Sequence, residues 1–141
     1  MVSYNKFETF VKDLGEGAHQ CHSAGHQFKV YATDAAPSAS ADSVKGDLLE
    51  ITSENGYPSG GSDMTNDYTE ASGTGTFTAT DVVWTATGGS FGALQYVVAY
   101  NDTQTSPADP LMCWWNYGSS VTVNHGETFT VDFGASVWTL T

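Results

Sequence analysis

The sequence contains no arginine and only four lysines, whereas aspartate and glutamate together number sixteen, so the formal net charge is −12 at pH 7. Nucleic-acid phosphates are bound largely through Lys and Arg side chains that displace counterions. A chain this acidic repels such polyanions, and nucleic acids are therefore excluded as expected partners. The same acidity keeps many copies soluble and suits attachment to a basic or cation-bearing surface.

Long hydrophobic runs and cysteine are also scarce. The sequence has no apolar run of the roughly eighteen residues that a membrane helix needs, and its N-terminus lacks the charged and apolar regions of a signal peptide. We expect a soluble protein without a membrane span. The two cysteines, Cys21 and Cys113, can form one disulfide at most, and we expect two free thiols because a reducing cytoplasm keeps them reduced.

The composition of the 141 residues favours one β-rich domain. This length is common for a single domain with one core. Thr, Val and aromatic residues are frequent, and fifteen glycines are available for turns. Long helices are not expected.

Residues 3–14 are predicted to form a short amphipathic helix. Apolar residues recur at spacings of three and four, and the pattern then ends at two glycines; the apolar positions are Tyr4, Phe7, Phe10, Val11 and Leu14. A helix of about a dozen residues is marginal in water on its own. Its apolar stripe must therefore pack either on the protein's own sheet or on a neighbouring subunit. We accordingly expect an N-terminal helix or arm, residues 1–20, and a β-sandwich domain, residues 21–141.

From residue 27 onward, period-two patterns predict a series of short strands. Gln27–Thr33 reads as a strand with one buried face, and Leu94–Tyr100 is the expected central strand. A turn is predicted at Gly118–Ser120 and a hairpin turn at His125–Gly126. Further strands are expected at 67–71, 75–80, 81–85, 111–117, 121–123, 129–133 and 137–140. About eight to ten strands without βαβ alternation predict an all-β, antiparallel β-sandwich of jelly-roll or immunoglobulin-like kind.

Four residues of metal-ligating type fall within eight positions: His19, Cys21, His22 and His26. Zinc prefers ligands of these types. Only Cys113 and His125 remain elsewhere, and they supply no second ligand group with finger-like spacing. We favour a polar linker, keep a metal site as the alternative, and expect no cofactor.

Asp63, Asp67 and Glu70, with Asn66 between them, are oxygen donors of the kind that calcium binds. Their order is not that of an EF-hand loop, and a solvated acidic loop is favoured. No H-E-x-x-H and no P-loop motif is present, and no nucleophile with its base or paired carboxylates can be assembled. We expect a protein without enzymatic activity, and a hydrolase is the least favoured class.

Met112, Trp114, Trp115 and Tyr117 form an aromatic strand in which the two tryptophans must point to opposite faces. One of them is then a core residue, and the other lies either beneath a loop or the N-terminal helix or on the surface. An exposed Trp can stack on a sugar ring or anchor a protein contact.

Five stretches of the chain resemble small virion structural proteins of tailed phages, of the head-decoration or cement type. They are YNKFETFVKDLGEGAH at Tyr4–His19, FKVYATDAAP at Phe28–Pro37, ENGYPSGG at Glu54–Gly61, WTATGGSFGALQYVVAYNDT at Trp84–Thr103 and PLMCWWNYGSSVTVNHGETFTVDF at Pro110–Phe133. The resemblance implies a β-sandwich subunit that is assembled in the host cytoplasm, binds the major capsid protein and coats the capsid surface as a homotrimer. It implies no catalytic residues.

Two functions therefore lead. The first is a capsid decoration subunit, whose candidate contacts are Tyr4, Phe7, Phe10, Leu14 and the outward member of Trp114 and Trp115. Its rival is a tail-fibre or receptor-binding module that grips a host glycan with the loops Ser53–Asp67 and Asn101–Pro110.

Overall fold

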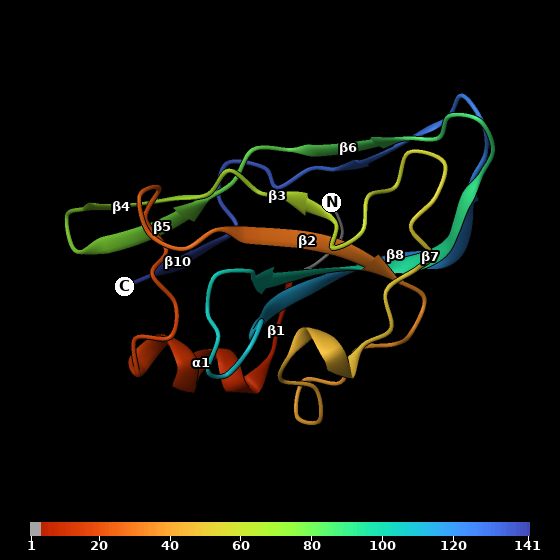
Figure 1. Ribbon diagram of the computed structural model, residues 1–141. Coiled ribbons are helices and arrows are strands. Elements are labelled where there is room, and N and C mark those ends of the chain that lie inside the picture. The colour runs from red at the N-terminus through yellow and green to blue at the C-terminus, as the bar shows by residue number, and fades with distance from the viewer. Residues whose placement is uncertain (1–3) are drawn as a thin grey trace.

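The computed structural model describes residues 4–141 and is built mainly from antiparallel strands (Figure 1). The elements in chain order are β1 (Tyr4–Lys6), α1 (Glu8–Gly15), β2 (Phe28–Thr33), the 3-10 helix η1 (Lys45–Asp47), β3 (Ser62–Asp63), β4 (Asp67–Ala71), β5 (Thr74–Thr78), β6 (Val82–Thr85), β7 (Phe91–Asn101), β8 (Leu111–Val123), β9 (Thr128–Val131) and β10 (Trp138–Leu140). The predicted all-β, sandwich-like fold with a short N-terminal helix is confirmed. Within residues 4–141 no helix has the length and apolar character needed to cross a membrane.

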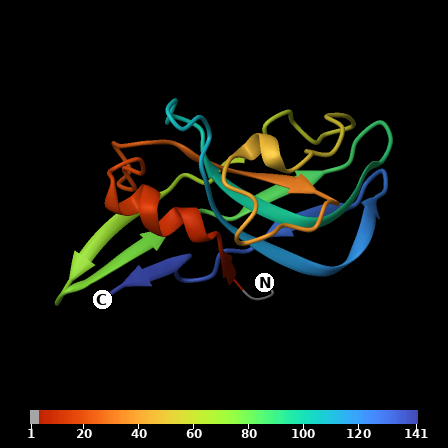
Figure 2. The same cartoon turned by 90° about the horizontal axis from the view of Figure 1, so that it is seen from below.

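Over residues 4–141 the strands form three antiparallel sheets. The large sheet has the order β1-β8-β7-β2-β3, and two small sheets have the orders β10-β5-β4 and β6-β9. In Figure 1 strand β6 lies above the large sheet, β4, β5 and β10 lie at the left of the molecule, and α1 and η1 lie below the large sheet. Figure 2, the view from below, shows α1, β1 and β10 gathered on one side of the molecule.

The main hydrophobic core lies between the large sheet and the two small ones. Phe28, Val97 and Trp115 of the large sheet face Phe77 and Trp84 of the small sheets in this cluster. The rings of Phe28 and Phe77 meet edge-on, with centroids 5.3 Å apart. Burying aromatic side chains of this size contributes roughly 1.5–3 kcal/mol each, so the facing sheets are held together chiefly by this layer.

A second, smaller cluster covers the opposite face of the large sheet. It contains Phe7, Tyr31, Leu48, Val98, Tyr100 and Leu111, with Trp114 packed against it. The prediction of one buried face for residues 27–33 is wrong, because the chain after β2 folds back over the sheet. Tyr31 and Thr33 are therefore as completely buried as the residues of the other face.

The N-terminal helix is shorter than predicted. Tyr4–Lys6 is extended and pairs with Cys113–Trp115 of β8, and α1 follows it. The prediction that Tyr4 belongs to a helical stripe is therefore wrong; Ser3, where the predicted helix begins, lies outside the described residues. Because β1 is part of the large sheet and Phe10 is part of the main core, the described part of segment 1–20 packs into the sandwich itself.

Strand β8 runs through a predicted turn. Gly118–Ser120 lies inside β8, whose far half continues to pair with β7 as far as Val123 opposite Phe91. The chain does turn at His125–Gly126, where the Glu127 N–H donates to the Asn124 carbonyl oxygen. The predicted hairpin is nevertheless wrong, because the next strand, β9, pairs with β6 in another sheet.

Candidate functional site

Two of the predicted contact residues hold the N-terminal segment on the protein's own sheets. Phe7 and Phe10 expose 0% and 4% of their areas. The Phe7 ring lies against Trp114, with centroids 4.6 Å apart, and the Phe10 ring meets Trp138 at 5.5 Å. These two aromatic residues therefore act inside the molecule, and they leave other residues of the segment to face outward.

Trp114 and Trp115 point to opposite faces of the large sheet, as predicted for neighbours in a strand. Trp115 belongs to the main core, where its ring meets Phe133. Trp114 is half-buried beneath Phe7 on the second cluster. The outward tryptophan is thus largely covered by the N-terminal segment.

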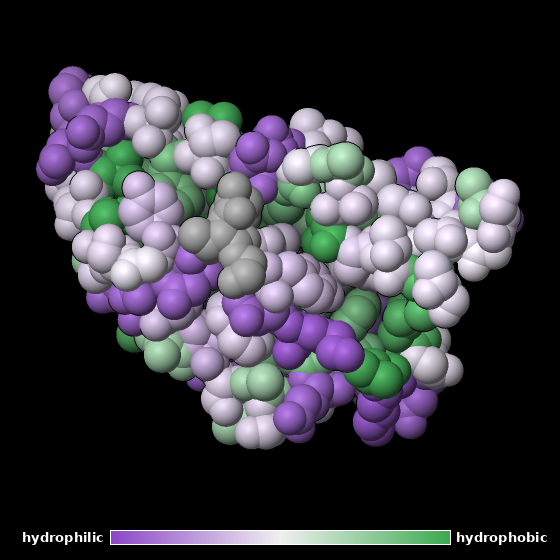
Figure 3. Space-filling view, turned by 180° about the vertical axis from the view of Figure 1, so that it is seen from behind, coloured by the Kyte–Doolittle hydropathy of each residue, from purple (hydrophilic) through white to green (hydrophobic). Residues whose placement is uncertain are grey.

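A groove of about 520 Å³ lies between α1, β1 and β10. Most of its lining is apolar, and the residues are Tyr4, Lys6, Phe10, Val11, Leu14, Trp138, Thr139 and Leu140. Val11 and Leu140 remain 56% and 54% exposed there. Seen from behind, apolar residues come to the surface at the lower right of the molecule, close to hydrophilic ones (Figure 3). The volume is in the range of ordinary ligand pockets.

Two strands beside the groove are outermost in their sheets. β1 ends the large sheet, and β10 ends a small one. An outermost strand carries backbone N–H and C=O groups on its open side that no neighbouring strand pairs. The groove therefore combines exposed apolar side chains with open strand edges, and it brings the predicted contact residues Tyr4, Phe10 and Leu14 together with a segment more than a hundred residues away.

Lys6 is the charged side chain in the lining of this groove. The other three lysines form ion pairs within the chain: Lys12–Glu16 at 2.6 Å, Lys29–Asp102 at 3.1 Å and Lys45–Glu50 at 3.0 Å. Among residues 4–141, Lys6 has no acidic group within ion-pair distance. Its ammonium group is therefore exposed and outside the ion pairs of the described part of the chain.

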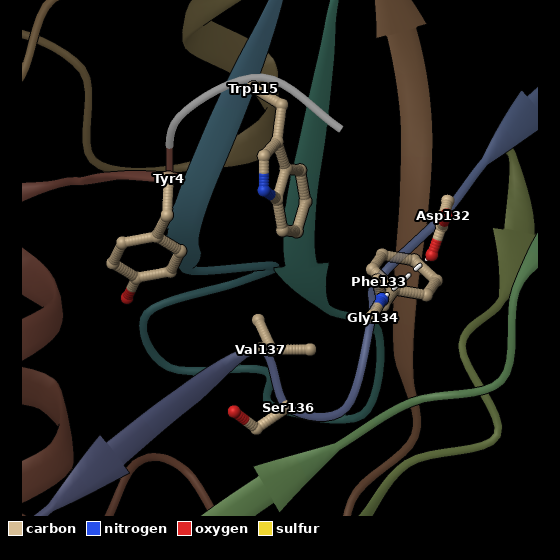
Figure 4. Close-up of a pocket in the computed structure, with 7 residues that line it drawn as sticks. All are labelled: Tyr4, Trp115, Asp132, Phe133, Gly134, Ser136 and Val137. Atoms are coloured by element: carbon tan, nitrogen blue, oxygen red, sulfur yellow. Dashed lines mark hydrogen bonds between the residues drawn. The ribbon is translucent and has the colours of Figure 1, made fainter.

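A smaller hollow of about 260 Å³ adjoins the groove at Tyr4 (Figure 4). Its other lining residues are Trp115, Asp132, Phe133, Gly134, Ser136 and Val137. In Figure 4 the Trp115 ring points toward Phe133 and Val137, and the Gly134 N–H donates to Asp132 Oδ1 at 2.8 Å. Because Ser136 and Val137 directly precede β10, hollow and groove follow one continuous stretch of backbone, residues 136–140.

The His/Cys segment is tied to the sandwich by two buried asparagines. Asn101 Nδ2 lies 3.2 Å from Nδ1 of His19 and 2.9 Å from Nδ1 of His26. Asn66 Nδ2 donates to the carbonyl oxygens of Cys21 and His26, at 2.9 and 3.3 Å. The sequence gives no signal for either asparagine, because each lies some forty or more positions from the residues it holds.

Burial sets the protonation states in this segment. It lowers the pKa of His19 to about 4, with a further contribution from His26, and it raises the pKa of the Cys21 thiol to about 12. At neutral pH the segment thus holds a neutral imidazole and a protonated thiol, whereas His22 is exposed. Over the described residues 4–141, no three His, Cys, Asp or Glu side chains come together as a group able to hold a metal ion.

The acidic residues proposed as calcium ligands each accept hydrogen bonds from different partners within the chain. Asp63 Oδ2 accepts from Gln27 Nε2, Asp67 Oδ1 from the N–H groups of Ser23 and Tyr68, and Glu70 Oε1 from the Gly73 N–H. Asn66 is turned inward, where Oδ1 accepts from the Phe28 N–H at 3.1 Å. The arrangement accounts for these side chains as loop-forming groups.

Gly88–Gly92 (GGSFG) has the letters of the G-x-S-x-G nucleophile motif of hydrolases. That motif acts where a strand turns sharply into a helix. Here the segment joins strand β6 to strand β7, and the Ser90 carbonyl oxygen accepts from Asn55 Nδ2 at 2.7 Å. His125 Nδ1 lies near this turn and accepts from the Gly88 N–H at 2.9 Å. The structural context that gives the motif its meaning is therefore missing.

The two loops proposed to grip a glycan lie apart. Asn55 in the first loop contacts the turn before β7, and Tyr57 is buried in the main core. The second loop, 101–110, lies against residues 43–45 on the other face of the large sheet. In Figure 1 the tips of the two loops are on opposite sides of the large sheet.

Comparison with known proteins adds no relative to this description. No protein family, curated protein or solved structure matches the chain significantly. The groove between α1 and β10 must therefore be interpreted from the residues that form it.

Proposed function

We propose that this protein is a non-enzymatic structural subunit of a tailed-phage particle, which binds the major capsid protein and decorates the capsid surface. The observation that carries the proposal is the apolar groove between α1, β1 and β10. Half-exposed apolar side chains and open strand edges beside one another are typical of contact surfaces. Covering the exposed halves of Val11 and Leu140 contributes on the order of 1 kcal/mol each.

The charge and the sequence resemblance support the same role. A net charge of −12 repels copies of the chain from one another and favours a basic or cation-bearing partner surface. A subunit that binds the assembled shell, and not its dissociated parts, stabilises that shell by mass action. In a homotrimer on the capsid, the contact between copies is heterologous and closes into a ring.

Co-sedimentation with empty heads assembled from the major capsid protein of the same phage tests this proposal. Val11→Glu places a charge in the groove, and Val83→Glu is its matched control, because Val83 is 55% exposed on β6 in a different sheet. We expect the wild type and Val83→Glu to sediment with the heads and Val11→Glu to stay in the supernatant. Equal binding by the two variants contradicts the assignment of the face.

The receptor-binding alternative is tested by glycan-array binding of the isolated protein. Specific glycan binding together with no binding to heads would replace decoration by the tail-fibre or receptor-binding function. Melting curves of both variants exclude unfolding as the cause of a lost contact.

A further inference from the structure

We propose that the groove takes up an extended segment of the partner protein, which adds to the open edge of β10 as a further strand and places a carboxylate on Lys6. The inference rests on the proposed function only in taking the α1–β10 face as the contact face. It adds the conformation and the chemistry of the segment that is bound.

A continuous backbone segment that ends in β10 runs along the groove. Residues 136–140 border the hollow and the groove in succession, and Tyr4 lines both. The three residues of β10 span about 10 Å, which matches three extended residues of an added segment. Because β10 is outermost in its sheet, an added strand can pair with its open backbone groups.

The side chains of the groove are a further argument. Trp138 lies partly exposed beside the groove, with its ring packed on the buried Phe10, and Val11 and Leu140 stand half-exposed around it. Alternate side chains of an added strand point to one face. An occupant with apolar residues at every second position therefore buries them on this surface and leaves its other side chains in solvent.

The charge of the groove favours an occupant that carries a carboxylate. Lys6 is the charged residue of the groove lining, and it has no acidic partner within residues 4–141. A carboxylate on the occupant therefore completes an ion pair at this end of the groove.

Selection from a random twelve-residue peptide library on the isolated full chain tests the inference without capsids. We expect enriched peptides to alternate apolar and polar residues and to carry Asp or Glu near one end. Methylating backbone nitrogens at alternate positions should weaken binding at least tenfold in one register and little in the other. No enrichment, no alternation or equal effects of both methylated sets would overturn the proposal.

Lysine variants test the charge. Selection on Lys6→Glu is expected to enrich peptides with Lys or Arg at the position where the wild type selects an acidic residue. The affinity of Lys6→Glu for an acidic peptide should fall at least about two- to fivefold. Lys12→Glu is the control, since Lys12 is exposed and pairs with Glu16 outside the groove, and it should leave the selected residue acidic. The same preference in both variants contradicts the pairing with Lys6.

Hydrogen exchange on the protein bound to empty heads separates this inference from the proposed function. Strand addition slows exchange of the Trp138–Leu140 amides. Suppose that the wild type binds the heads, that Val11→Glu does not, and that the β10 amides of the bound wild type exchange as fast as in the free protein. The decoration role then stands and strand addition is refuted. If the heads do not bind but the selected peptides protect β10, strand addition stands and the decoration role fails.

Discussion

Asn101 belongs to a buried polar network. Replacing it by aspartate is expected to reverse how the free energy of unfolding changes with pH. Oδ1 of Asn101 accepts hydrogen bonds from the backbone N–H groups of Thr103 and Gln104, at 3.0 and 3.1 Å. Backbone N–H groups only donate, so Nδ2 is the atom that faces Nδ1 of His19 and of His26. Nδ2 has two hydrogens and can only donate, so Nδ1 of the buried His19 accepts in this network, and burial keeps the His19 imidazole neutral by lowering its pKa.

At alkaline pH, Asn101→Asp is expected to be less stable than the wild type, because a carboxylate has no N–H groups to donate. Nδ2 of Asn101 also donates to the Ala18 carbonyl oxygen at 3.1 Å. In Asn101→Asp, a carboxylate oxygen faces this oxygen and the unprotonated nitrogen of His19, both in a buried environment. An unpaired buried polar group costs about 1–3 kcal/mol, so the two groups together should lower the free energy of unfolding by about 2–6 kcal/mol at pH 8.

Acidification acts in opposite directions on the two proteins. In the wild type, burial lowers the pKa of His19 from 6.5 to about 4, so between these values the unfolded chain binds a proton that the folded chain does not. Wild-type stability therefore falls as the pH drops from 6.5 toward 4, by up to about 3 kcal/mol. In Asn101→Asp the carboxylate favours imidazolium, the folded pKa rises, and stability is gained as the pH falls below this folded pKa.

Urea unfolding followed by tryptophan fluorescence at pH 8, 6.5 and 5 measures these effects. The stability gap between wild type and Asn101→Asp should narrow steadily with acidification. The control is Asn116→Asp on β8, since Asn116 is half-buried and its Oδ1 accepts from Gln95 Nε2 and the Gly118 N–H, roles that aspartate keeps. A constant gap for Asn101→Asp across the three pH values would refute the reasoning.

Three further outcomes are expected. Phe77→Ala should lower the free energy of unfolding by about 3–5 kcal/mol in urea titrations, because its ring is fully buried, whereas Val83→Ala should change it by about 0.5 kcal/mol or less. Native Cys21 should resist a thiol reagent at pH 8 and react only after unfolding, since burial raises its pKa to about 12; rapid labelling of the folded protein would argue against its burial. Gly61→Ala should cost at least about 3 kcal/mol, because its Cβ would collide with a β2 carbonyl oxygen, whereas Gly73→Ala, at a similar positive φ but in open space, should cost about 1 kcal/mol; equal losses would contradict the proposed clash.

Local sequence patterns predict the strands in which apolar and polar residues alternate between turn residues. Leu94–Tyr100 is found inside β7, and 67–71 coincides with β4, because alternation and turn residues specify these segments. The spacing of Tyr4 from Phe7 fits a helical period and therefore predicts a helix there. Its pairing with Trp115 depends on a strand more than a hundred residues away, which no local window contains.

The candidate site shows the same division. The sequence predicts a contact face with Tyr4, Phe7, Phe10 and Leu14. The structure buries Phe7 and Phe10 and places Tyr4, Phe10 and Leu14 in the lining of one groove, while the contact itself stays a prediction. The sequence does not predict Lys6, Trp138 or Leu140 as site residues, because their positions beside the groove depend on the order of strands in two different sheets. The His/Cys segment invites a metal hypothesis from residue types alone, whereas its structural partner Asn101 can be identified only in three dimensions.

The position of Trp138 has a consequence for biosynthesis. Its ring stacks on Phe77 with centroids 5.3 Å apart and meets Phe10 at 5.5 Å, so residues from early, middle and late parts of the chain share one contact. A nascent chain that has left the ribosome only as far as β9 still exposes Phe10 and Phe77. Stable folding therefore waits until β10 has emerged, and before that point the chain depends on chaperones or on its own charge to avoid aggregation.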